Sequence, residues 1–284
     1  MKDTLAEHFS DTTRTNAAYR ATESARPDAV FEDRLADGLA GERGRKLAKL
    51  APMLARNGWP IVARTKAIDE LILTSIADGC DRILNLGAGF DTRPYRLDLP
   101  ADFHWVDVDL PAMVDQAERR LRKEQPRCRV FRSAVDITDA AARAAFLDDA
   151  VRGASKVAVV TEGLLIYLEE SQVRDLHRDL TRPEIGWWIT DLSSPGIVSA
   201  MRKRDVRDRG APPLQFGPAN GVAVFEQDGW QAVDVESEFE VAARLNRLPR
   251  LMRMFARAHQ PDPRDVEHAQ WSGITRVQHV HADN

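Results

Sequence analysis

The sequence of 284 residues predicts an α/β protein built on a doubly wound, mostly parallel, Rossmann-like sheet of seven strands. Three observations support this fold class. Residues 1–80 show helical patterns and no convincing strand. Apolar strand-like runs then alternate with helical segments, as a parallel sheet with crossover helices requires. Near the chain end, residues 273–281 alternate in polarity and predict a late antiparallel strand at or near the sheet edge.

Three helices are expected before the first strand, over residues 12–25, 43–56 and 61–77. The first ends at Arg26-Pro27, because a residue that precedes proline avoids the helical region. The third carries an apolar stripe with helical spacing. We expect residues 1–80 to form an N-terminal helical cap, or lid, packed on the core.

The core is expected to span residues 81–284, with a cap insertion at about 194–228. Its strands are predicted at residues 82–86, 102–107, 129–133, 156–161, 186–192, 231–236 and 273–281. Its helices are predicted at residues 112–123, 139–151, 171–181 and 238–247.

Composition narrows the class of protein. Hydrophobic residues at 43% and charged residues at 30% are ordinary for a globular domain. A net charge of -4 without a basic stripe argues against nucleic acid as a partner. Cys80 and Cys128 lie in or beside apolar runs, which suggests reduced core residues of a cytoplasmic protein. No segment resembles a signal peptide or a membrane span, so no membrane partner is expected.

The turn after the first predicted strand has the strongest functional signal, Asn-Leu-Gly-Ala-Gly-Phe-Asp-Thr-Arg over residues 85–93. Gly87 and Gly89 lack the Cβ atom that would keep a ligand away from the backbone. Asp107 and Asp109 follow about twenty residues later, where an acid can accept both hydroxyls of a ribose. The pattern predicts a site for a cofactor that contains a nucleoside.

The same turn argues against a dinucleotide. The third glycine of G-x-G-x-x-G is replaced by Thr92, and Asp91 precedes it. The Asp91 carboxylate would repel a pyrophosphate but suits a ligand with an ammonium and a sulfonium group, as in S-adenosylmethionine. Acids also follow the third and fourth predicted strands, at Asp136 and Glu162. Because the carboxyl ends of parallel strands share one edge, these acids are candidates for one site.

The segment L-G-A-G-F-D-T-R-P-Y-R-L at residues 86–97 resembles the signature of the leucine carboxyl methyltransferase family, which includes O-methyltransferases of bacterial polyketide pathways. V-D-L-P at 108–111, V-D-I-T-D at 135–139 and T-E-G-L-L-I-Y-L at 161–168 agree with it. The resemblance covers about residues 10–195. It implies a class I methyltransferase sheet, S-adenosylmethionine as methyl donor and S-adenosylhomocysteine as product.

By that resemblance, the residues that bind the cofactor's methionine portion and ribose fall on matched positions. Arg64 would pair with the methionine carboxylate. Gly87 and Ala88, in one turn with Gly89, would lie against the methionine portion. Asp109, directly before Leu-Pro, matches the ribose-binding acid better than Asp107, which would face the mouth of the core or cap the next helix.

The remaining matched positions concern the adenine and the ammonium group. Asp136 would accept from the exocyclic amine, and Ile137 would pack on the ring. Glu162 would accept from the ammonium, a task that Asp91 would share unless it braces the loop. No metal site is expected, since the seven histidines are scattered.

The acceptor is expected to be a small molecule, such as a natural-product intermediate, that is methylated on oxygen. A carboxylate is favoured and needs no base, whereas a phenol or enol would need one. The candidates for such a base are Glu162, which is mainly a positioning group, Asp191, or a histidine brought in by the cap. Glu23 and Tyr19 are candidates for the acceptor pocket.

Two other classes stay open at this point. One is an NAD(P)-dependent oxidoreductase, which would bind a nicotinamide cofactor and not S-adenosylmethionine. The other is a protein that binds S-adenosylmethionine without turnover. The intact glycines and strand-end acids argue against this class.

Overall fold

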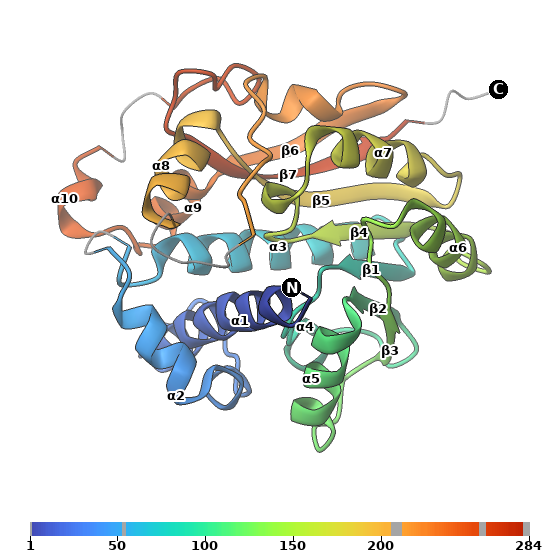
Figure 1. Ribbon diagram of the computed structural model, residues 1–284, viewed down its shortest axis with the longest axis horizontal. Coiled ribbons are helices and arrows are strands. Elements are labelled where there is room, and N and C mark those ends of the chain that lie inside the picture. The colour runs from blue at the N-terminus through green and yellow to red at the C-terminus, as the bar shows by residue number, and fades with distance from the viewer. Residues whose placement is uncertain (1, 53–54, 206–211, 256–259, 281–284) are drawn as a thin grey trace.

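The computed structural model describes residues 2–52, 55–205, 212–255 and 260–280. They form a seven-stranded sheet flanked by helices (Figure 1), with the strand order β3-β2-β1-β4-β5-β7-β6. The strands are β1 (Arg82–Leu86), β2 (His104–Asp109), β3 (Arg129–Ala134), β4 (Val157–Thr161), β5 (Ile185–Ser193), β6 (Trp230–Ser237) and β7 (Ser272–His279).

The strand directions confirm the predicted fold class. The pairs β1–β2, β2–β3, β1–β4 and β4–β5 are parallel, and β7 runs antiparallel to both β5 and β6. The late antiparallel strand therefore lies one position in from the edge, which β6 forms. β2 begins and ends two residues later than predicted, so Asp109 is its last residue.

Three helices precede the sheet, and further helices connect its strands. Before β1 come α1 (Lys2–Ser24), α2 (Ala36–Lys49) and α3 (Trp59–Ala77). After it come α4 (Arg93–Arg96), α5 (Pro111–Leu121), α6 (Ala140–Ala150), the 3-10 segment η1 (Leu165–Tyr167), α7 (Glu170–Leu180), α8 (Pro195–Asp205), the 3-10 segment η2 (Gly221–Phe225), α9 (Glu238–Arg244) and α10 (Arg250–Arg253).

The first two helices differ from the prediction. α1 begins at Lys2 rather than at residue 12. α2 spans Ala36–Lys49 rather than residues 43–56. Residues 53–54 of that predicted range lie outside the described part of the chain. Pro52 explains the early end of α2, because the residue before proline avoids helical angles. Gly41, at φ 59°, kinks this helix, which is why its first turns lack a regular helical pattern in the sequence.

The two faces of the sheet bury separate apolar clusters, as a doubly wound fold requires. On one face, Ile83 of β1 shares a cluster with Ile68 of α3 and residues of α9. On the other face, its neighbour Leu84 shares a cluster with Leu147 of α6 and Leu176 of α7. The strands therefore need apolar side chains on both faces, which explains their nearly continuous apolar runs.

The helices α1, α2, α4 and α5 form a third apolar cluster around Phe90, Tyr95 and Met113. In Figure 1, α1 and α2 lie on the same side of the sheet region as α4 and α5. A buried ion pair, Arg247 Nη2 to Glu23 Oε1 at 2.7 Å, ties α1 to the segment after α9. Among the described residues, no helix has both the length and the apolar character that crossing a membrane would take.

Candidate active site

Side chains from α1 and α3 and the ends of β1 and β4 line a cavity at the carboxyl edge of the sheet. It contains about 500 Å³ of space, its solvent-filled mouth included. Its lining consists of Thr13, Asn16, Arg20, Arg64, Thr65, Asn85, residues 87–91, Arg93, Arg96 and Glu162. The structure thus brings together six residues predicted from the sequence, namely Arg64, Gly87, Ala88, Gly89, Asp91 and Glu162.

The glycine loop at residues 87–91 follows β1 and needs glycine at two positions. Gly87 (φ 72°) and Gly89 (φ 55°) adopt the left-handed region that other residues avoid. A Cβ atom on Gly89 would lie 2.7 Å from Thr13 Oγ1, and one on Gly87 would lie 3.0 Å from Leu164 Cδ1. Backbone conformation therefore favours glycine at both positions, and a Cβ atom on Gly89 would also force Thr13 to shift.

Asp109 anchors this loop to β2. Its Oδ2 accepts from the Gly89 N–H at 2.8 Å, and its Oδ1 accepts from the Leu110 N–H at 2.7 Å. Burial raises the pKa of Asp109 to about 6, although both backbone donors act against that rise. Each oxygen keeps a second lone pair with which to accept a hydroxyl of a sugar.

Asp107 has a different environment. Its Oδ1 accepts from Asn85 Nδ2 at 3.1 Å and from Trp105 Nε1 at 2.8 Å, both inside the protein. Burial, and then the nearby Asp91 charge, raise the pKa of Asp107 to about 7. Asp107 was expected either to face the mouth of the core or to cap the next helix. The structure shows that it faces the core.

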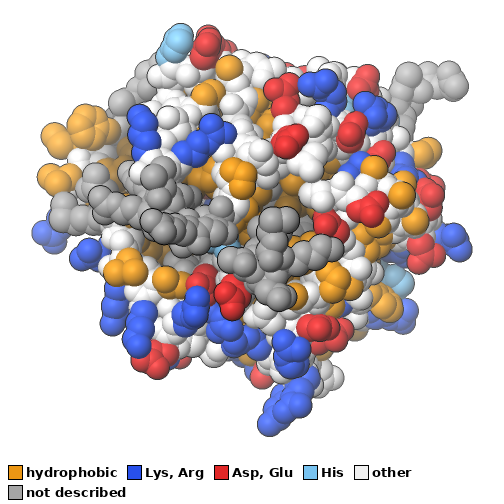
Figure 2. All heavy atoms as spheres, viewed as in Figure 1, with side chains coloured by type: hydrophobic (Ala, Val, Ile, Leu, Met, Phe, Trp, Pro, Cys, Tyr) orange, Lys and Arg blue, Asp and Glu red, His pale blue; other side chains and the backbone are white. Residues whose placement is uncertain are grey.

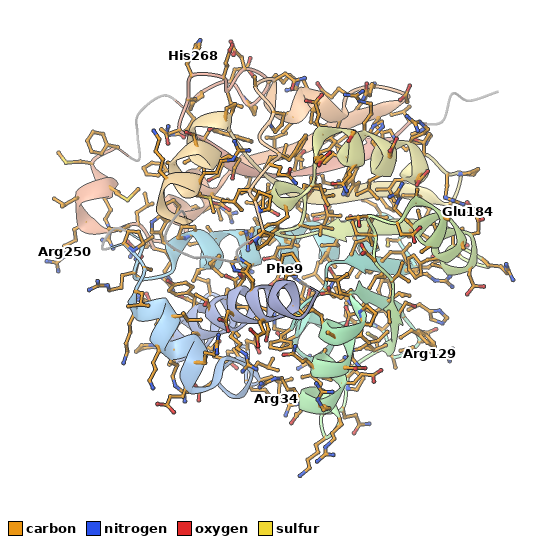
Figure 3. The ribbon with its side chains drawn as sticks, in the orientation of Figure 1. Phe9, Arg34, Arg129, Glu184, Arg250 and His268 are labelled. Atoms are coloured by element: carbon orange, nitrogen blue, oxygen red, sulfur yellow. The ribbon has the colours of Figure 1, made fainter. Side chains whose placement is uncertain are left out.

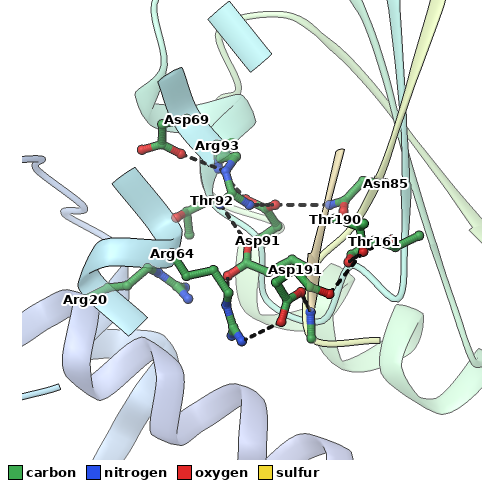
Figure 4. A network of polar contacts seen from close by, with 12 residues as sticks. Arg20, Arg64, Asp69, Asn85, Asp91, Thr92, Arg93, Thr161, Thr190 and Asp191 are labelled. Carbon is green, nitrogen blue, oxygen red and sulfur yellow. Dashed lines mark hydrogen bonds and ion pairs between the residues drawn. The ribbon is translucent and has the colours of Figure 1, made fainter. Parts of the chain in front are cut away.

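Arg93 is the centre of a buried ion cluster (Figure 4). Its Nε pairs with Asp69 Oδ1 at 2.7 Å, its Nη1 with Asp91 Oδ2 at 2.6 Å and its Nη2 with Glu162 Oε2 at 2.7 Å. The Arg93 side chain is only 3% exposed, so water cannot replace these partners. Asp91 also accepts from the Arg93 backbone N–H at 2.7 Å, which shows that it braces the loop.

Arg64 extends the cluster toward β5. Its Nε donates to Glu162 Oε1 at 3.0 Å and its Nη1 to Asp191 Oδ2 at 3.2 Å. Figure 4 shows Arg64 and Asp191 pointing toward each other. The Gly163 N–H donates to the other Asp191 oxygen at 2.6 Å. Arg64 thus joins the end of β4 to the end of β5.

The charges within this cluster set its protonation. Burial alone would raise the pKa of Glu162, but Arg93 and Arg64 outweigh that effect and hold it at about 2. Glu162 is therefore ionised at neutral pH. Burial raises the pKa of Asp191 despite Arg64, and it raises the pKa of the nearby Glu238 to about 7.

Comparison with known proteins identifies the family. The model of the leucine carboxyl methyltransferase family matches residues 13–181. The chain belongs to this family. A Streptomyces coelicolor protein named "Putative S-adenosyl-L-methionine-dependent methyltransferase" is 37% identical over 235 residues, which cover 76% of this chain and 78% of that protein. A Mycolicibacterium smegmatis protein of the same name is 35% identical over 221 residues, covering 72% and 70%.

Solved structures agree on the fold of this family member. A Thermobifida fusca structure, titled as a "putative methyltransferase", superposes with a TM-score of 0.57 at 17% identity and covers 94% of both chains. A DUF574 family protein of Streptomyces avermitilis superposes with a TM-score of 0.58 at 14% identity, covering 93% of this chain and 96% of that one. The resemblance seen in the sequence is confirmed.

The cavity of this methyltransferase fits the predicted cofactor by charge. Four arginines line the cavity, Arg20, Arg64, Arg93 and Arg96. They pair directly with five carboxylates, those of Asp33, Asp69, Asp91, Glu162 and Asp191. With all of them ionised, one negative charge is in excess. S-adenosylmethionine has a sulfonium, an ammonium and a carboxylate, so it brings one net positive charge.

Two predicted adenine contacts are not part of the cavity. Asp136 is exposed, and its Oδ1 accepts from the Thr138 N–H at 3.0 Å and from Thr138 Oγ1 at 2.6 Å. Ile137 is buried in the apolar cluster that contains Leu84. Their contact with adenine stays a prediction.

The two candidates for the acceptor pocket make contacts inside the protein. Glu23 pairs with Arg247, and Tyr19 Oη donates to the Ala48 carbonyl at 3.2 Å.

Sequence reasoning missed several residues of the site. Thr13, Asn16 and Arg20 were missed because no local pattern shows that α1 packs over the glycine loop. Phe9 of α1, labelled in Figure 3, also contacts Tyr167 of η1, with ring centroids 5.2 Å apart. Glu238 directly follows β6 just as Glu162 directly follows β4, so a strand-end signal was present, but the residue was assigned only to a helix start.

Proposed function

We propose that this protein, an S-adenosylmethionine-dependent methyltransferase, transfers the methyl group to an oxygen atom of a small molecule, with a carboxylate as the first candidate. The observation that supports this best is the cavity lined by the glycine loop, Arg64 and Glu162, whose four arginines pair directly with five carboxylates. An acceptor such as a natural-product intermediate would enter beside them.

The residues of the chain would bind and orient the donor. When bound, S-adenosylmethionine supplies a methyl group that its sulfonium already activates. Asp109, held by Gly89 and Leu110, would accept from the ribose hydroxyls. Glu162 would face the ammonium, and Arg64, whose Nε and Nη1 make the described ion pairs, would offer Nη2 to the methionine carboxylate. Such fixed positions lower the entropic cost of aligning the methyl group with the acceptor.

The carboxylate acceptor is favoured by its chemistry. It is anionic at neutral pH and attacks without loss of a proton. Its reaction with a sulfonium removes two opposite charges, and α1, three of whose residues line the cavity, would favour that by excluding water. The family's description as leucine carboxyl methyltransferase supports the same choice.

A phenol or enol acceptor is the second candidate, because one observation favours it. Burial raises the pKa of Asp191, and it raises that of Glu238 to about 7, which suits a general base at neutral pH. Asp191, near the end of β5, pairs with Arg64, and Glu238, directly after β6, lies near enough for the Arg64 charge to lower its pKa against the effect of burial. Either one would take the hydroxyl proton as the oxygen attacks.

One experiment tests the proposal and separates the two acceptors. The protein is incubated with S-adenosylmethionine labelled on the methyl group and with a panel of carboxylic, phenolic, amine and thiol acceptors. A labelled product that mild base hydrolyses is an ester, and a stable product is an ether. Methylation only of amines or thiols would refute transfer to oxygen. Family membership leaves the oxidoreductase and the non-catalytic alternatives without support.

A further inference from the structure

Three arginines share a surface groove between α1 and α5. Arg14 of α1 and Arg119 and Arg120 of α5 line it together with Ala112, Asp115 and Gln116. We call it the α1–α5 groove. None of these residues lines the cofactor cavity. Figure 2 shows Lys and Arg side chains gathered over the lower part of this face, where Figure 1 places α2 and α5.

These arginines lack acidic partners. In the part of the chain that the structure describes, no carboxylate oxygen lies within 4.0 Å of their guanidinium nitrogens, Asp115 included. The neighbouring Arg43, by contrast, pairs with Asp11 at 2.5 Å. Arg14 Nε donates only to the neutral Ser10 hydroxyl, at 3.2 Å. Three guanidinium groups and one carboxylate therefore leave two positive charges in the groove.

A buried ring holds two of these charges near each other. The guanidinium carbons of Arg14 and Arg120 lie 5.9 and 5.3 Å from the centroid of Phe90, which is 1% exposed. Burial, followed by the charges of Arg14 and Arg119, lowers the pKa of Arg120. Packing thus keeps positively charged groups close together. Their mutual repulsion is unfavourable, and a bound anion would offset it.

We propose that the α1–α5 groove is a binding site for a phosphoryl group, distinct from the methyl-transfer cavity. A phosphate dianion matches the two surplus charges, and guanidinium groups bind its oxygens through paired N–H donors. Gln116 Oε1 accepts from Ser10 Oγ at 2.8 Å, which leaves the Gln116 amide N–H groups for the ligand. Phe90, which contacts Arg14 and Arg120, belongs to the glycine loop and also lines the cofactor cavity, so the groove and the cavity share this residue as a common wall.

Calorimetric titration tests this site in the full chain at constant ionic strength. The probes are inorganic phosphate and a simple phosphate monoester, glycerol 3-phosphate. Equal affinity for both shows that the phosphoryl group alone is recognised, and tighter binding of the ester shows that an esterified phosphate is preferred. Absence of binding of either probe at millimolar concentration overturns the proposal.

Charge-matched variants locate the binding. Arg119→Gln with Arg120→Gln should weaken phosphate binding about tenfold or more. The control, Arg122→Gln with Lys123→Gln, removes the same charge just past the end of α5, outside the groove, and should keep the affinity within about twofold. An equal loss in both variants would show diffuse attraction and refute the site. If the first pair disturbs the fold, Arg14→Gln gives the same test from α1.

Discussion

Two groups of arginines in this protein have opposite surroundings. The buried arginines, Arg64, Arg93 and Arg96, each pair with at least one carboxylate at 3.2 Å or less, and their side chains are at most 13% exposed. The surface arginines, Arg14, Arg119 and Arg120, have no carboxylate within 4.0 Å in the described part of the chain. Only residues 91 and 92 separate Phe90, whose ring contacts Arg14 and Arg120, from Arg93 in the buried group.

The difference follows from the cost of removing a charge from water. A buried guanidinium must be neutralised by its neighbours, because desolvation of an ion costs several kcal/mol. An exposed one keeps its hydration and can remain unpaired until a ligand arrives. The buried group therefore fixes the shape of the cofactor cavity, whereas the surface group stays available.

The largest expected effect comes from removing a buried arginine. Arg93→Met should lower the free energy of unfolding by about 3–5 kcal/mol. The substitution leaves Asp91 without a close cation, and Asp69 and Glu162 each lose one of their arginine partners. Denaturant unfolding measures this loss. Arg119→Met is the matched surface variant and should change stability by no more than about 0.5 kcal/mol. Similar losses in both would end the distinction between the two groups.

The next effect concerns a buried carboxylate without a close ion pair. The nearest guanidinium nitrogen to Asp107, Arg132 Nε, lies 3.7 Å away. The pKa of Asp107 is about 7 in the folded protein and about 3.9 when unfolded. The folded state therefore holds a proton that the unfolded state has lost, and this group makes stability fall as pH rises from about 4 to 7.

Asp107→Asn should remove that part of the pH dependence. The free energy of unfolding of the variant minus that of wild type should be about 2–4 kcal/mol larger at pH 8 than at pH 4.5. Unfolding curves at both values measure the gain. Glu162 acts in the opposite direction and in another window, since its pKa of about 2 is lowered and its stabilisation is lost only as pH falls below about 4.5. A constant difference between variant and wild type would contradict the raised pKa.

A smaller effect is expected on cofactor affinity. Asp109→Ala removes the acceptor of the Gly89 and Leu110 N–H groups and the proposed ribose contact, so S-adenosylmethionine should bind at least about tenfold more weakly. Asp136→Ala, at an exposed carboxylate that accepts from Thr138 and not from the glycine loop, should cost less than about threefold. Calorimetry compares the two. If Asp136→Ala lost more affinity than Asp109→Ala, the cofactor site would have to be assigned nearer to the end of β3.

The sequence alone predicted the parts of this site that depend on local pattern. The bounds of β1, the glycine loop and Glu162 after β4 were all predicted, because strand periodicity and glycine turns are local properties. Their meeting at one edge followed from parallel pairing. Arg64 was assigned only through the family resemblance, since its helix shows no functional pattern.

Contacts between distant segments could not be predicted. The three-way pairing of Arg93 joins α3, the glycine loop and β4, and the approach of Thr13 to Gly89 depends on how α1 packs. The kink at Gly41 hid the start of α2 for a similar reason, because only tertiary packing makes the interrupted helix stable. Such features arise from packing and not from periodicity.

The smallest expected effect tests whether the surface arginines repel one another. Arg120→Gln loses a contact with the Phe90 ring and relieves repulsion from Arg14 and Arg119, so stability should change by no more than about 0.5 kcal/mol. Salt separates the two contributions, since only the repulsion acts over a distance that salt screens strongly. Without phosphate, the variant should therefore gain stability relative to wild type at low salt and lose that gain at high salt. Arg122→Gln, outside the groove, should show a weaker salt dependence. A gain that instead grows with salt would mean that Arg120 has an attractive partner.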